Sequence, residues 1–227
     1  MYEAAREVDH DPESFPEICS WLTRKGLGGF YQNAWIPNSA AVLLFGESPQ
    51  AFFPGAIVEF VRYEGSDAYA PVAVRETITG TLPDQLESLW MHLSAHLESI
   101  PVSIEEIRTL SRPEYPLKAL QELARNLVQH RLYEGTNAPG RVEWFDDRVV
   151  FSSPGGPFGH ANEGEFGSHT DYRNPTISRW LVELGYVEQL GRGIRLVKKM
   201  LASNGNPALE VEADGFTVVT VRKAGTR

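Results

Sequence analysis

The chain has 227 residues, a length that suits one large domain or two small ones. It carries 21 Lys and Arg against 30 Asp and Glu, a net charge of −9, which argues against binding nucleic acid mainly through a basic surface. A single cysteine, Cys19, excludes an internal disulfide framework and a zinc site made of several cysteines. No apolar run approaches the roughly 18 residues that span a membrane. The acidic N-terminus lacks the apolar core of a signal peptide, so we expect a cytoplasmic protein with no membrane contact.

The charge is unevenly distributed. Residues 174–227 hold eight Lys and Arg against five Asp and Glu, a balance of +3, so the remainder carries −9 − 3 = −12. A basic C-terminal end on an acidic body is suited to binding phosphates, although a difference of this size is also common on solvated surfaces.

The first half of the chain predicts a peripheral segment and a small α/β unit. Residues 1–37 are rich in Asp, Glu, Pro and Gly, with one short helix candidate at 15–22. In residues 38–105, leucines spaced by three and four predict a helix that starts at Pro83 and reaches Ile100. Short apolar and β-branched runs predict strands at 41–45, 56–62 and 71–78. A polar stretch at 101–116 predicts a link, with a domain boundary near residue 105.

The second half, residues 106–227, predicts another α+β unit. A glycine-rich stretch at 154–173 has no apolar period and is expected to be a long loop, which is usually functional or mobile. Helices are expected at 116–131, after Asn174-Pro175 and after Gly193, and strands at 141–145, 148–151, 209–212 and 216–221.

The helix at 116–131 carries a polar stripe. Five apolar side chains fall within an arc of about 100° at the helical period: Leu117, Leu120, Ala124, Leu127 and Val128. Glu122, Asn126 and His130 follow one another at intervals of four on the opposite side. This stripe is either a solvated face or a functional wall, because an amide oxygen suits Mg²⁺ and a carboxylate can activate water.

Gly191, Arg192 and Gly193 come directly before a predicted helix. Glycines allow close approach of the backbone, and free N–H groups at a helix start attract anions. The segment therefore predicts a phosphate contact, strengthened by Arg192, or else a simple chain reversal.

Glu122-x3-Asn126-x3-His130 resembles the first motif of the GHKL (Bergerat-fold) ATP-binding superfamily. The chain is most similar to the divergent branch found in bacterial transcriptional regulators and RecG-like, ATP-dependent DNA helicase-related proteins. Further stretches agree in order and spacing: NSAAVLLFG (38–46), FFPGAIVEFVRYEG (52–65), ITGTLPDQLE (78–87), FDDRVVFSSPGG (145–156), YRNPTISRWLVELGYVEQLGRGIRLVKKM (172–200) and FTVVTV (216–221).

The resemblance implies a Bergerat-type α/β sandwich, with helices packed on one face of a mixed, largely antiparallel sheet. It also implies ATP and Mg²⁺ as cofactors. Glu122 would act on the attacking water, Asn126 would help hold Mg²⁺ on the nucleotide, and His130 would belong to the same wall. Residues 157–173 resemble the ATP lid. The expected nucleotide contacts are Asn126, His130, Ser153, Gly155, Gly156, Gly191, Arg192 and Gly193.

Ser153 stands where the superfamily keeps an acidic residue for the adenine amino group. A serine hydroxyl can accept a hydrogen bond from that amino group but carries no charge.

Three functions therefore stay open. The first is an ATP-binding regulatory domain, with Mg²⁺-dependent ATP hydrolysis undecided. The others are a winged-helix-like DNA-binding module and a degenerate nucleotide fold that serves as a homodimer scaffold. Relatives carry an Alba-like DNA-binding domain of the Schlafen type, so DNA contact is expected through a domain absent from this chain.

Overall fold

A computed structural model describes residues 14–105, 108–187 and 191–225. Its main element is a six-stranded sheet in the order β4-β3-β7-β8-β10-β9, where β3 and β7 are parallel and the other neighbours antiparallel. The strands are β3 (Val58–Tyr63), β4 (Val72–Ile78), β7 (Gly140–Trp144), β8 (Arg148–Pro154), β9 (Glu210–Asp214) and β10 (Phe216–Arg222). The expected mixed, largely antiparallel sheet is confirmed.

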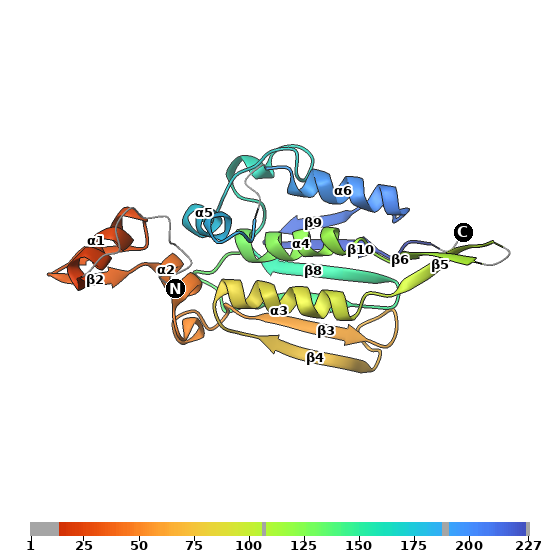
Figure 1. Cartoon of the computed structure of the whole chain (residues 1–227), viewed down its shortest axis with the longest axis horizontal. Coiled ribbons are helices and arrows are strands. Elements are labelled where there is room, and N and C mark those ends of the chain that lie inside the picture. The colour runs from red at the N-terminus through yellow and green to blue at the C-terminus, as the bar shows by residue number, and fades with distance from the viewer. Residues whose placement is uncertain (1–13, 106–107, 188–190, 226–227) are drawn as a thin grey trace.

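Three helices cover one face of this sheet (Figure 1). They are α3 (Leu82–Ala95), α4 (Leu117–His130) and α6 (Gly193–Asn204), and α4 lies between the other two. The predicted apolar arc of α4 is largely confirmed, because Leu120, Ala124 and Val128 are fully buried in the core. The apolar arc of α4 packs in the core. The polar stripe on the other side of the helix faces the space next to α6.

An N-terminal arm precedes the sheet. It consists of α1 (Phe15–Arg24) and a two-stranded hairpin, β1 (Gly28–Tyr31) with β2 (Ala34–Pro37). Figure 1 shows the arm at one end of the molecule, and α1 contacts α5 (Pro175–Glu183) through the rings of Trp21 and Trp180. The peripheral helix predicted at 15–22 is confirmed as α1.

The strand predicted at 41–45 is wrong. These residues belong to α2 (Ser39–Phe45), which a short 3₁₀ helix (Pro49–Ala51) follows. The Asn38 side chain caps α2 by accepting a hydrogen bond from the backbone N–H of Ala41 at 3.0 Å. A short, continuous apolar run does not distinguish a buried helix from a buried strand. The Asn38 cap is the local feature that favours the helix.

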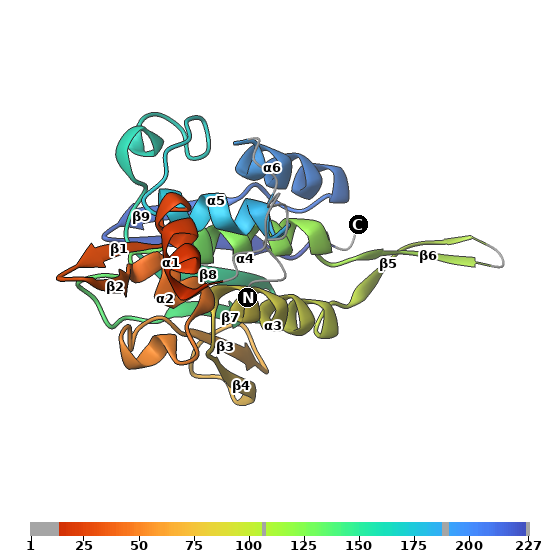
Figure 2. The same cartoon turned by 60° about the vertical axis from the view of Figure 1, so that its left-hand side comes forward.

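The link predicted at 101–116 is also wrong. Strands β5 (Ser99–Glu105) and β6 (Arg108–Pro113) form an antiparallel hairpin that projects from the body (Figures 1 and 2). Consequently α3 ends at Ala95 and does not reach Ile100. The domain boundary near residue 105 stays a prediction, and strands from both sides of it share one sheet.

Across the described ranges of the chain, every helix is too short or too polar to cross a membrane.

Candidate functional site

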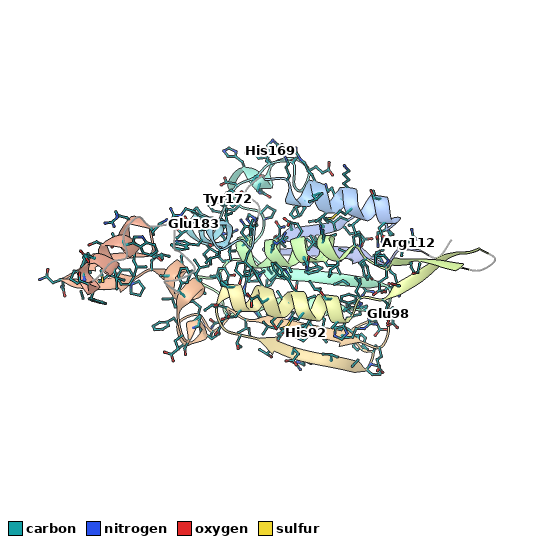
Figure 3. The ribbon with its side chains drawn as sticks, viewed as in Figure 1. His92, Glu98, Arg112, His169, Tyr172 and Glu183 are labelled. Atoms are coloured by element: carbon teal, nitrogen blue, oxygen red, sulfur yellow. The ribbon has the colours of Figure 1, made fainter. Side chains whose placement is uncertain are left out.

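A cavity lies between α4, the ends of β8 and β10, the 157–173 loop and the start of α6. The cavity has a volume of about 140 Å³, roughly ten times what one water molecule needs. His169 and Tyr172, labelled in Figure 3, come from the loop that closes it. Seven of the residues singled out in the sequence line the wall: Glu122, Asn126, His130, Ser153, Gly156, Gly191 and Gly193.

The polar stripe of α4 forms one side of the cavity. Asn126 is oriented by its own helix, because its Nδ2 donates to the Glu122 backbone carbonyl at 2.7 Å and approaches Glu122 Oε1 at 3.4 Å. Its Oδ1 accepts no hydrogen bond from the described part of the chain. An amide oxygen on the cavity wall is therefore available to a ligand.

Glu122 and Gly193 are in close contact. Glu122 Oε2 pairs with Arg125 at 2.6 Å, while its Oε1 lies against Gly193, where any Cβ would overlap it. Gly193 is the first residue of α6, so the carboxylate sits beside the positive end of that helix. Gly193 is needed so that Glu122 Oε1 can lie close to the backbone, and not because the residue has a positive φ.

The end of β8 supplies the opposite side. Ser153 is 6% exposed, and its hydroxyl makes no hydrogen bond to any described residue. Gly156 lines the cavity with open space next to its Cα. Gly155, at φ +94°, lies outside the wall and lets the chain turn after Pro154.

The 157–173 loop is folded over the cavity and fastened to α6. Lys198 Nζ binds Glu165 Oε1 at 2.5 Å and the Phe166 carbonyl at 2.9 Å, and Arg195 donates to the Ser168 carbonyl at 2.7 Å. At its far end Arg173 donates to the Gly156 carbonyl at 2.9 Å. These contacts hold the loop, including its short 3₁₀ turn (Gly159–Asn162), in a closed position.

Arg192 does not join the other predicted site residues at the cavity. It occupies the N-cap position of α6 without a capping hydrogen bond from its side chain, is exposed, and does not line the cavity. Gly191, at φ +58°, does line it. The glycines on either side of Arg192 thus bring the backbone to the cavity while its side chain stays outside.

Sequence reasoning missed several wall residues. Thr217 and Val219 on β10 pair with Ser153 and Phe151 on β8, and all four line the cavity. The signal available in the sequence was strand alternation, because every second side chain of a strand lies on the same face of the sheet. Tyr172 gave no such signal, because it lies in a loop without a period; its ring stacks on His130 with centroids 5.6 Å apart.

Two titratable groups on the wall are perturbed. Backbone N–H groups of Tyr172 and His160 donate to Asp171 and lower the pKa of its carboxyl. Burial, assisted by the nearby positive charge of Arg173, lowers the pKa of His130 to about 4. His130 is therefore neutral at pH 7 and can serve as a stacking surface or a hydrogen-bonding group.

Because the folded pKa of His130 lies below its ordinary value of 6.5, the unfolded chain binds more protons between pH 6.5 and about 4. We expect the free energy of unfolding to decrease as the pH is lowered from 6.5 to about 4, by up to about 1.4 kcal/mol per pH unit. Urea denaturation at pH 7 and pH 5 measures this loss. His130→Gln should remove most of it, whereas His160→Gln, whose side chain is 76% exposed, should not. Equal pH dependence in both variants would contradict the assignment.

No three His, Cys, Asp or Glu side chains form a metal site in residues 14–105, 108–187 and 191–225. Mg²⁺ in nucleotide sites is commonly held by one or two protein oxygens together with phosphates and water. Asn126 Oδ1 is an oxygen of α4 on the cavity wall that suits this arrangement.

Comparison with known proteins agrees with this fold. Residues 138–221 match the family model described as "Putative ATP-dependent DNA helicase recG C-terminal". That segment contains β7 to β10, α5 and α6, but not the polar stripe of α4. No protein with curated annotation matches the chain.

A solved structure is also similar, the DIP2311 protein from Corynebacterium diphtheriae, with 21% identity and a TM-score of 0.70. The alignment covers 99% of this chain but 44% of that protein, so the chain spans less than half of its relative's length. At this identity the likeness shows the fold alone. The family match over residues 138–221 supports an ATPase-like domain similar to that of RecG-related proteins.

Proposed function

We propose that the cavity binds ATP together with Mg²⁺, and that the chain is the GHKL-type nucleotide-binding part of a transcriptional regulator or DNA helicase-related protein. One observation carries the proposal. Seven residues from three separate segments, each predicted from the sequence as a catalytic or nucleotide-binding residue, line the same cavity: Glu122, Asn126 and His130, then Ser153 and Gly156, then Gly191 and Gly193.

Each wall group has a chemical task in this proposal. Asn126 Oδ1 contributes an oxygen ligand to the metal, which when bound would neutralise phosphate charge. The Ser153 hydroxyl accepts a hydrogen bond from the adenine amino group. The backbone N–H groups at the start of α6 bind phosphate oxygens. Glu122 accepts a proton from the attacking water if ATP is turned over.

The winged-helix alternative is not favoured by the surroundings of α5. Its Arg179 donates to the Lys25 carbonyl, and its Glu183 pairs with Lys25 at 3.3 Å, so both charged side chains face the N-terminal arm. A DNA-reading helix needs a free basic face. In our proposal DNA contact belongs to another domain, the protein is cytoplasmic, and homodimerisation remains part of the expected assembly.

Titration calorimetry with ATP and ADP, with and without Mg²⁺, tests the proposal on the full chain. We expect both nucleotides to bind and Mg²⁺ to tighten ATP binding. Glu122→Gln should keep ATP binding while any hydrolysis falls by at least about a hundredfold. Absence of binding at millimolar nucleotide would refute the proposal, and loss of binding in Glu122→Gln would remove Glu122 from the assigned role.

A further inference from the structure

Arg125 lies on α4 next to the cavity but is not part of its wall. Its NH1 is 2.6 Å from Glu122 Oε2, and the two side chains are only 25% and 16% exposed. The guanidinium also lies over the Trp90 ring, 5.3 Å from the ring centroid. Arg125 is therefore held in place by both an aromatic ring and a carboxylate.

The position of Glu122 creates an electrostatic conflict with the proposed ligand. Its Oε1 lies against Gly193 at the start of α6, the place where the helix N–H groups would receive phosphate oxygens. Like charges in a partly buried site repel strongly. The other carboxylate on the wall, Asp171, accepts hydrogen bonds from two backbone N–H groups, so it is already compensated.

We propose that Arg125 neutralises Glu122 so that polyphosphate can bind beside it, and that Arg125 fixes the carboxylate with Oε1 toward the cavity. Arg125 is thus a positioning residue, and the inference rests on the proposed nucleotide function. The role predicts an effect that grows with the number of phosphates on the ligand. A purely structural role, through packing on Trp90, would affect all ligands alike.

A double-mutant cycle measured with ATP, ADP and adenosine tests the inference. The variants are Arg125→Gln, Glu122→Gln and the double variant, all titrated without Mg²⁺, where phosphate charge is largest. We expect Arg125→Gln to weaken ATP binding about tenfold, ADP less, and adenosine less than about twofold. Arg125→Gln should cost clearly less ATP affinity in the Glu122→Gln background than in the unmodified chain, because Glu122→Gln leaves no carboxylate for Arg125 to hold in place.

Two further variants control the cycle. Arg125→Lys keeps the positive charge and should retain more ATP affinity than Arg125→Gln. Arg141→Gln breaks an ion pair of similar length, 2.7 Å to Glu59, away from the cavity wall and should leave all affinities unchanged.

The outcomes separate this inference from the function on which it rests. Equal loss for ATP and adenosine, an undiminished loss in the Glu122→Gln background, or failure of Arg125→Lys to bind would each overturn the role of Arg125. If the unmodified chain binds ATP but the cycle shows no coupling, only this inference fails. If the unmodified chain binds no nucleotide, the proposed function fails and the inference fails with it.

Discussion

Replacing Asn126 by alanine should remove the contribution of Mg²⁺ to ATP binding. The reason is that Asn126 Oδ1 is a wall oxygen without a partner in the described chain, while Nδ2 fixes the amide on Glu122. We expect ATP affinity with Mg²⁺ to fall at least about tenfold, as when a metal ligand or its support is lost. Binding without Mg²⁺ should change much less, and calorimetry at two Mg²⁺ concentrations measures both quantities.

Two variants make this prediction specific. Asn126→Asp keeps an oxygen at the same place and should retain a Mg²⁺ effect. Gln121→Ala removes an amide of α4 that does not line the cavity and should change neither affinity. An unchanged Mg²⁺ effect in Asn126→Ala would exclude Asn126 from the metal site.

The largest effect on stability is expected for Trp180→Ala. Trp180 on α5 is 1% exposed and contacts the rings of Trp21 and Phe45, with centroids 6.1 and 5.0 Å away. Its Nε1 also donates to the Lys25 carbonyl at 3.3 Å. Removing a buried tryptophan costs about 3–5 kcal/mol of the free energy of unfolding. Here the loss would also weaken the attachment of the N-terminal arm to α5, which Arg179 and Glu183 still contact through Lys25.

Urea denaturation gives the free energy of unfolding for Trp180→Ala. Phe52→Ala is the matched control, because that ring is 72% exposed and surface substitutions usually change stability by less than about 0.5 kcal/mol. A loss below about 1 kcal/mol for Trp180→Ala would show that the arm and α5 are not held together as the contacts indicate.

Elements with a regular period or a defined turn could be predicted from the sequence. The α4 stripe followed from residue spacing alone, since side chains four positions apart share a helix face. The predicted strands at 209–212 and 216–221 pair as β9 and β10, joined at Asp214-Gly215, a dipeptide typical of hairpin turns, and Gly215 adopts φ +69°. In both cases the information is local.

Features that depend on contacts between distant segments could not be predicted. Two local features were mispredicted as well: the apolar run at 41–45 forms α2 behind the Asn38 cap, and segments that contain Pro101 and Pro113 pair as the hairpin of β5 and β6. Thr217 reached the cavity through its register with Ser153. The close approach of Glu122 to Gly193 depends on how α4 and α6 pack, which residue spacing within either helix does not encode.

Hydrogen–deuterium exchange of the full chain with Mg²⁺ and ATP tests the central claim most directly, because it locates the ligand as well as detecting it. The closed 157–173 loop, the turn at 153–156 and the start of α6 surround the cavity. We predict slower amide exchange in these segments with ATP, and unchanged exchange in the β1–β2 hairpin. Slowing confined to the N-terminal arm, or no slowing at saturating ATP, would contradict nucleotide binding in this cavity.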